Sequence, residues 1–138
     1  MPFYGRRLFI MDEFIIEGGH RLHGMVSPSG NKNAALPLLA ACLLTEHPIT
    51  LRNVPQIRDV QTMLQLLVDV GAEVTETDDH ALTVAARDIR TARLAPELCQ
   101  DIRASILLAG PMLARCGKVE LPPPGGDIIG RRRLDTHF

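Results

Sequence analysis

The spacing of apolar residues predicts two helices in the first half of the chain. Residues 33–44 are apolar at nearly every position, which predicts a central helix that is covered on all sides. Pro37 fits this helix if it falls near the start, where a missing N–H costs least. In the next helix, apolar residues recur at i, i+3, i+4 and i+7: Val60, Met63, Leu64 and Leu67. Asp59 is its expected N-cap, and Gly71 is expected at C′, just after the end of the helix.

Short apolar and β-branched runs, separated by Gly, Pro and polar turns, predict the strands. The expected strands cover residues 14–18, 21–26, 49–54, 72–77 and 81–86. The last two flank Asp78-Asp79-His80 and should pair as an antiparallel hairpin. From residue 21 onward the expected order is therefore β, α, β, α, β, β, which indicates an α/β fold.

The pattern then starts again. Pro96 is a suitable first residue for a helix that keeps its apolar spacing until Gly117, and Pro111 should kink or split it. A short strand over residues 119–121 follows. The polar residue before each apolar helix, Asn33 in the first copy and Arg103 in the second, gives an offset of 70 residues. If this is a repeat, the chain holds one full unit and the start of another.

Composition narrows the class of protein. The 138 residues include 15 Lys and Arg against 16 Asp and Glu, so the formal net charge is −1, which argues against a nucleic acid or an anionic membrane as partner. The first apolar stretch is interrupted by Asp12 and Glu13, too early for a signal peptide, and nothing later is long enough to span a membrane. We expect one soluble, cytoplasmic domain.

The cysteines and histidines favour neither disulfides nor a metal site. There are three cysteines, far apart, and two stand in apolar surroundings, which predicts buried, unpaired thiols in a reducing compartment. The five histidines are scattered without the spacing of metal ligands, so no metal is expected.

Three places combine a flexible backbone, a helix start and charge. Residues 29–33 bring the N–H groups of a helix start together with the Lys32 ammonium, an arrangement that attracts anions. Arg103 opens or lies within an apolar helix, where an anionic ligand could pair with it. The third place is the glycine-rich loop after residue 124, with Asp127 followed by three arginines at residues 131–133.

Each of these places also has a plain structural interpretation. Short charge runs are usually solvated surface, and Arg103 could pair with Asp101 or Glu97. Asp127 could be only a turn residue after two glycines. The glycine spacing matches neither a nucleotide P-loop nor a dinucleotide-binding fingerprint.

The same places resemble the enolpyruvyl transferase family. The segments that carry the resemblance are residues 29–37 (SGNKNAALP), 53–55 (NVP), 59–60 (DV), 103–105 (RAS) and 125–132 (GGDIIGRR). The resemblance runs from about Met11 to Phe138 and is to the branch that acts on UDP-N-acetylglucosamine. It implies part of an inside-out α/β barrel domain built from βαβαββ units, with residues 1–10 upstream of the family's usual start.

The resemblance implies an enzyme of peptidoglycan and cell-wall synthesis without a metal or organic cofactor. Such an enzyme transfers the enolpyruvyl group of phosphoenolpyruvate to the 3-hydroxyl of UDP-N-acetylglucosamine and releases phosphate. By position, Lys32 would contact phosphoenolpyruvate and the charge that develops on the intermediate, and Asn33 would hold the sugar substrate. The further implied positions are Arg103 for an anionic group, Arg132 for phosphoenolpyruvate, and Arg133 and Asp135 for the nucleotide.

Two departures from the family pattern matter. Most members have a cysteine where this chain has Asp127; a carboxyl can still act as a general acid, but it is a poor nucleophile towards an epoxide such as fosfomycin. Full members are also several times longer, and Met11 could be the true start. We therefore expect the chain alone to be inactive or nearly so, unless it self-associates or meets a complementing chain. The alternatives are a noncatalytic module that binds UDP-sugar or phosphate, and a remnant without function.

Overall fold

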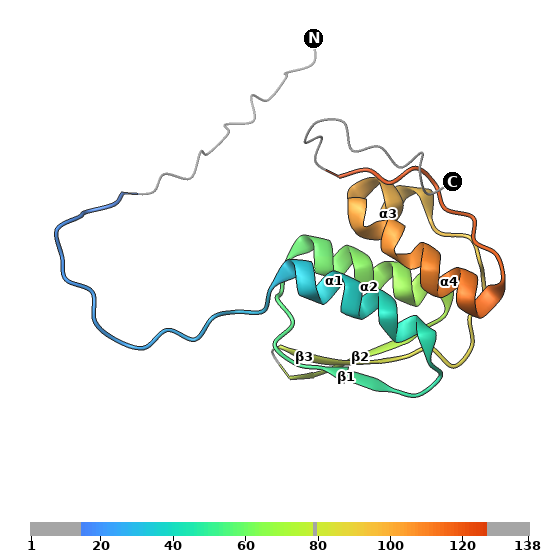
Figure 1. Cartoon of the computed structure of the whole chain (residues 1–138), viewed down its shortest axis with the longest axis horizontal. Coiled ribbons are helices and arrows are strands. Elements are labelled where there is room, and N and C mark those ends of the chain that lie inside the picture. The colour runs from blue at the N-terminus through green and yellow to red at the C-terminus, as the bar shows by residue number, and fades with distance from the viewer. Residues whose placement is uncertain (1–14, 79, 127–138) are drawn as a thin grey trace, which may run out of the picture.

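The computed structural model describes residues 15–78 and 80–126 of the chain. Within these residues, the helices all lie on one side of a small antiparallel sheet, with α3 on the side of α2 away from the strands (Figure 1). The α-helices are α1 (Lys32–Ala41), α2 (Arg58–Val70), α3 (Pro96–Asp101) and α4 (Ala109–Cys116). The 3-10 helices are η1 (Cys42–Leu44) and η2 (Arg103–Leu108), and the strands are β1 (Ile49–Leu51), β2 (Glu73–Asp78) and β3 (Ala81–Ala85).

The sheet has the order β1-β3-β2, and the predicted hairpin is confirmed. Because side chains alternate along a strand, Val84 faces the helices while Thr83 points to the opposite face. There the register sets Thr83 beside Thr50 and Thr75, and the hydroxyls of Thr50 and Thr83 lie 2.9 Å apart. The first strand ends earlier than predicted because Asn53 has a φ of 55° and turns the chain.

Helix α2 confirms the predicted amphipathic helix, and its apolar side is buried in the core. The buried residues are Val60, Thr62, Met63, Leu66, Leu67 and Val70. Gly71 ends the helix in the left-handed region, as expected. The predicted start is wrong, however: the N-cap is Ile57, and Asp59 is the second residue of the helix. Asp59 makes an ion pair instead of a cap.

Helix α1 and η1 confirm a helical segment after Asn31, but not its full burial. One side packs into the core through Ala35, Leu36, Leu39 and Ala40. On the other side, Leu38 and Leu44 are 53% and 54% exposed, so the prediction of a helix covered on all sides is wrong for the described structure. Pro37 is the sixth residue of the helix rather than part of its first turn.

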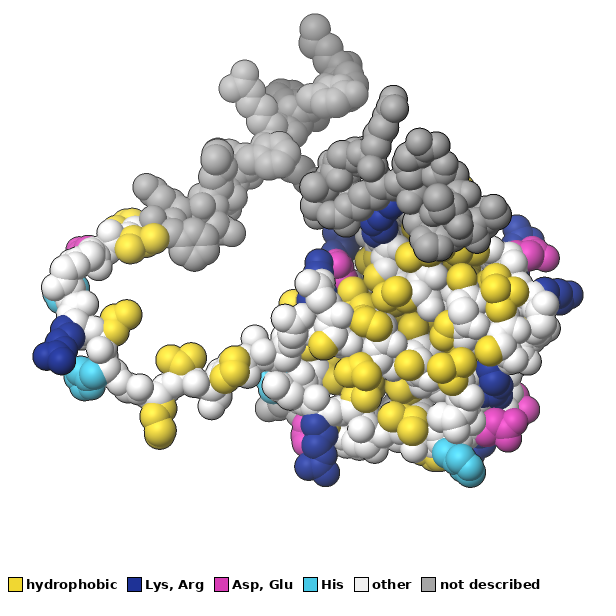
Figure 2. Space-filling model, viewed as in Figure 1, with side chains coloured by type: hydrophobic (Ala, Val, Ile, Leu, Met, Phe, Trp, Pro, Cys, Tyr) yellow, Lys and Arg dark blue, Asp and Glu magenta, His cyan; other side chains and the backbone are white. Residues whose placement is uncertain are grey.

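Apolar side chains gather on the face on which α1 and α4 lie, as Figure 2 shows. The exposed large apolar residues of α1, η1, η2 and α4 are Leu38, Leu44, Leu107 and Leu113. We call these four residues the apolar patch. A patch of this kind on a small domain commonly marks a surface that contacts something else.

The segment from Pro96 to Gly117 is helical as predicted, but it divides at another place. Pro96 opens α3, as expected. The break comes at Ile102, whose φ of −135° and ψ of 135° are extended, whereas Pro111 falls in the first turn of α4, where proline is tolerated. Gly117 closes α4. In place of the strand predicted for residues 119–121, one parallel bridge joins Glu120 to Arg93.

Residues 15–26 form no strand, so the prediction of strands over residues 14–18 and 21–26 is wrong for the part that the structure describes. The large apolar side chains there are 84–102% exposed: Ile15, Ile16, Leu22, Met25 and Val26. A strand needs a neighbour for its N–H and C=O groups, and no other described strand pairs with this segment.

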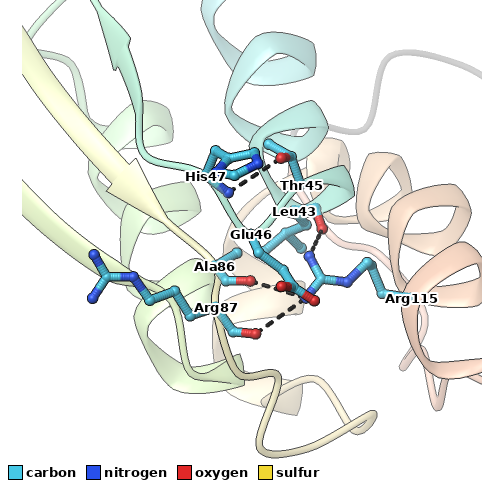
Figure 3. Close-up of polar contacts among 7 residues, drawn as sticks. All are labelled: Leu43, Thr45, Glu46, His47, Ala86, Arg87 and Arg115. Atoms are coloured by element: carbon cyan, nitrogen blue, oxygen red, sulfur yellow. Dashed lines mark hydrogen bonds and ion pairs between the residues drawn. The ribbon is translucent and has the colours of Figure 1, made fainter.

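Arg115 ties α4 to the core through main-chain oxygens, as Figure 3 shows. Its guanidinium donates to the carbonyls of Leu43 at 2.8 Å, Ala86 at 3.0 Å and Arg87 at 3.3 Å, and lies 3.9 Å from a Glu46 carboxylate oxygen. The side chain is only 17% exposed. One residue thus holds η1, the end of β3 and α4 together.

No helix in residues 15–78 and 80–126 is long and apolar enough to cross a membrane.

Candidate functional site

One pocket lies where α1, α2 and η2 begin, and it has a volume of about 650 Å³. Its polar and charged lining residues are Lys32, Asn33, Arg58, Asp59, Gln100, Asp101 and Arg103. Lys32, Asn33 and Arg103, which the sequence analysis singled out, therefore line the same space although the last is far from the others along the chain. We call it the Lys32 pocket.

The start of α1 is held in place by a close approach of two loops. A side chain at Gly30 would overlap the carbonyl oxygen of Asn53 and come within 2.9 Å of Pro55 Cδ, so only glycine fits there. At the next residue, the Asn31 side chain caps the helix by accepting from the N–H groups of Asn33 and Ala34, at 2.7 and 3.3 Å. We expected the N–H groups at this helix start to be free to bind an anion. For the N–H groups of Asn33 and Ala34 that expectation is wrong, because Asn31 already accepts from both.

The Lys32 ammonium lies over the pocket in an ion pair. Its Nζ is 2.9 Å from Asp59 Oδ2, and the two side chains are 49% and 38% exposed. Asp59 also lies in the first turn of α2, where the helix dipole favours a carboxylate. An ammonium has three N–H donors, so Lys32 can keep this pair and still offer donors to a ligand in the pocket.

Arg103 is half-buried at the start of η2, beside the glycine-rich loop. Gly125 N–H donates to Cys99 O at 2.9 Å, and Gly126 N–H donates to Gln100 O at 3.0 Å, so the loop is fixed against the end of α3. A side chain at Gly125 would overlap the Gln100 carbonyl, and one at Gly126 would come within 2.9 Å of Arg103 N. The two glycines thus allow the loop to lie against the pocket.

Four of the candidate residues, Asp127, Arg132, Arg133 and Asp135, lie outside the described residues. Gly126, the residue before Asp127 in the sequence, lines the Lys32 pocket. The loop that leads to Asp127 is therefore anchored at the pocket that Lys32 and Arg103 line.

Arg58, on the rim of the pocket, is a residue to which the sequence patterns did not point. Arg58 is the first residue of α2, and its Nη2 lies 3.8 Å from Asp101 Oδ2. Asp101, which the sequence offered as a partner for Arg103, thus pairs with Arg58. One feature of the sequence could have pointed to Arg58. It is a cation at the first position of a helix, where the helix dipole disfavours positive charge.

The described thiols are unpaired, and two of them are buried, as predicted. Burial raises the pKa of Cys42 and of Cys99, so both stay protonated at neutral pH. Cys99 lies near the Lys32 pocket through its carbonyl, but its protonated, fully buried thiol is a poor nucleophile. Within residues 15–78 and 80–126, no three His, Cys, Asp or Glu side chains gather as metal ligands would.

The pocket therefore combines cations from three helical segments with an amide side chain and a glycine-anchored loop. This arrangement suits a ligand that carries phosphate or carboxylate groups. A family model described as EPSP synthase (3-phosphoshikimate 1-carboxyvinyltransferase) matches residues 16–138. The chain belongs to the EPSP synthase family.

Curated relatives in this family share much of the sequence. A UDP-N-acetylglucosamine 1-carboxyvinyltransferase from Bradyrhizobium diazoefficiens is 65% identical over 125 residues, which are 91% of this chain and 29% of that protein. The protein of the same name from Treponema denticola is 51% identical over 128 residues, covering 93% of this chain and 30% of that protein. The chain thus spans about 30% of the length of the curated relatives it matches.

A solved structure confirms the expected fold. The enolpyruvyl transferase NikO from Streptomyces tendae superposes with a TM-score of 0.63 at 29% sequence identity, over 72% of this chain and 23% of that one. The described part of this EPSP synthase family member is accordingly a portion of the enolpyruvyl transferase fold. The resemblance drawn from the sequence segments is confirmed.

Proposed function

We propose that this chain forms part of a UDP-N-acetylglucosamine 1-carboxyvinyltransferase. The reaction transfers the enolpyruvyl group from phosphoenolpyruvate to the 3-hydroxyl of UDP-N-acetylglucosamine and releases phosphate. The observation that carries the proposal is the convergence of Lys32, Asn33 and Arg103 on one pocket, next to the anchored Gly125-Gly126 loop. The names of the curated relatives support the choice of substrate.

Each residue then has a role that its chemistry can fill. Lys32 stabilises the negative charge that develops in the transition state, with its ammonium already held over the pocket by Asp59. Asn33 binds the sugar, and Arg103 binds an anionic group of the substrates. Asp127 acts as the general acid.

The remaining assignments concern positions outside the described residues. Arg132 binds phosphoenolpyruvate, and Arg133 and Asp135 bind the nucleotide. In the whole enzyme, residues 11–138 supply one βαβαββ unit and the beginning of a second, after an upstream extension of ten residues. The first strand of this unit, at residues 21–26, needs a partner strand that the described residues do not provide. We place the protein in the cytoplasm, because buried unpaired thiols are typical of a reducing compartment.

A chimeric enzyme tests the proposal. Residues 14–138 of this chain replace the matching segment of the Bradyrhizobium relative, and phosphate release from phosphoenolpyruvate is measured with and without UDP-N-acetylglucosamine. We expect release that depends on the UDP-sugar and that is lost in the Lys32→Ala and Asp127→Asn chimeras. A folded chimera without turnover would contradict the proposed function.

The 138-residue chain is measured in the same assay. Positioning of the reacting groups can supply about 7–11 kcal/mol of a reaction barrier, and this chain spans only about 30% of the length of its curated relatives. We therefore expect little or no release by the chain alone. Binding of UDP-N-acetylglucosamine without turnover is the result that a noncatalytic binding module also gives, and the chimera separates these two functions.

A further inference from the structure

The Lys32 pocket holds a third cation, Arg58, to which the family resemblance gives no role. We infer that Arg58 binds a phosphate group of the substrates together with Lys32 and Arg103. The inference rests on the proposed function, because it concerns the same pocket and the same phosphate-bearing substrates. It concerns affinity for the substrates and not the chemical step.

The formal charge of the pocket supports a role for Arg58. Among the described lining residues there are three cations, Lys32, Arg58 and Arg103, and two carboxylates, Asp59 and Asp101. Without Arg58, the carboxylates would cancel the other two cations. Phosphoenolpyruvate carries about three negative charges at neutral pH. A pocket of zero formal charge would not attract such a ligand, whereas Arg58 makes these described residues net positive.

The contacts of Arg58 leave its guanidinium available to a ligand. Within residues 15–78 and 80–126 it pairs with Asp101, at 3.8 Å, and the two side chains are 83% and 48% exposed. An exposed pair of this length contributes little to stability, so a phosphate can replace the carboxylate at small cost. A guanidinium also suits this exchange because two parallel N–H donors can bind two phosphate oxygens.

The position of Arg58 in its helix agrees with a binding role. It is the first residue of the 13-residue helix α2, and Lys32 is the first residue of the 10-residue helix α1. The helix dipole disfavours a cation at both places, so neither residue is there to stabilise its helix. Departures from a local preference tend to mark functional positions, and both of these residues line the pocket.

Titration calorimetry on the 138-residue chain tests the inference, with phosphoenolpyruvate and UDP-N-acetylglucosamine as two separate ligands. We expect Arg58→Gln to weaken binding of at least one ligand about five-fold, the factor that one charge pair about 4 Å apart supplies in a water-like dielectric. The ligand whose affinity falls identifies the phosphate that Arg58 contacts. The dependence of affinity on salt should also become less steep, because one charge no longer takes part.

Two variants separate ligand binding from a structural role. Arg93→Gln removes an arginine of similar exposure whose pair with Glu120, at 3.9 Å, lies outside the pocket, and it should leave both affinities unchanged. Asp101→Asn breaks the same ion pair as Arg58→Gln but keeps the guanidinium, so binding should be at least as tight as in the unmodified chain. Arg58→Gln should also melt no lower than the unmodified chain.

Several outcomes would overturn the inference. These are equal affinity of Arg58→Gln and the unmodified chain for both ligands, an equal loss in Arg93→Gln, or weaker binding in Asp101→Asn. Absence of binding of either ligand to the unmodified chain would overturn it too, because Arg58 would then have no anion to bind in this chain. The proposed function is decided separately, by turnover of the chimera.

Discussion

Replacement of Arg115 by methionine should destabilise the fold more than its place on a short helix suggests. Methionine keeps much of the apolar stem but removes the donors to the carbonyls of Leu43 and Ala86, at 2.8 and 3.0 Å (Figure 3). Hydrogen bonds from a charged group contribute about 1.5–3 kcal/mol each, and the lower value for these two bonds gives a loss of about 3 kcal/mol. For a domain of this size, that loss corresponds to a fall in melting temperature of about 10 °C.

Urea unfolding followed by far-ultraviolet circular dichroism measures this loss, and two further variants show its origin. Glu46→Gln removes only an ion-pair partner that is 75% exposed and 3.9 Å away, so it should cost less than about 0.5 kcal/mol. Arg115→Lys keeps the charge but not the fork of donors, so its stability should lie between those of Arg115→Met and the unmodified chain. The reasoning is refuted if Arg115→Met unfolds within about 0.5 kcal/mol of the unmodified chain.

Three further predictions follow from the structure and sequence. Gly30→Ala should cost about 1–3 kcal/mol in urea unfolding because its Cβ overlaps the Asn53 carbonyl, whereas Gly110→Ala, with nothing within 4 Å, should cost nothing; equal effects would contradict this. Burial raises the pKa of Cys42 and Cys99, so the folded thiols stay protonated while unfolded thiols ionise, and stability should fall as the pH rises above roughly 8.5–9. A Cys42→Ala, Cys99→Ala double variant that keeps the same pH dependence of unfolding would count against that cause. Fosfomycin with UDP-N-acetylglucosamine should leave the mass of the chain unchanged, because the carboxylate of Asp127 is a poor nucleophile; a mass increment on Asp127 would show otherwise.

The parts of the fold that the sequence predicts best are those specified within one segment. The helix ending at Gly71 has its apolar residues at helical spacing and a glycine to close it, and the hairpin of β2 and β3 has a polar turn between two short runs. Residues 15–26 show the limit of the same reasoning. Their composition is that of strands, but strand formation depends on a partner elsewhere in the chain, which no local pattern specifies.

Three residues of the candidate site, Lys32, Asn33 and Arg103, could be predicted from the sequence, but their contacts could not. The glycine-rich and basic segments identified Lys32 and Arg103, yet the ion pair between Lys32 and Asp59 depends on how α1 packs against α2. Asp59 has the residue type and place of an N-cap, and only the tertiary structure shows that its carboxylate serves Lys32 instead. Arg58 was overlooked for a similar reason, because exposed arginines on amphipathic helices are common.

The apolar patch and the Lys32 pocket together indicate how much of the proposed catalytic site this chain provides. Lys32 is 49% exposed and Arg58 83% exposed, so water surrounds the cations that the substrates would meet. In water, each charge pair contributes little and is screened by salt, whereas the same pair in a closed site is several times stronger. Of the apolar patch, Leu38 and Leu107 are exposed on α1 and η2, which also line the pocket. Under the proposed function, the described pocket alone should therefore bind phosphate-bearing ligands weakly, and strong stabilisation of a transition state would need a further surface that excludes water from these cations.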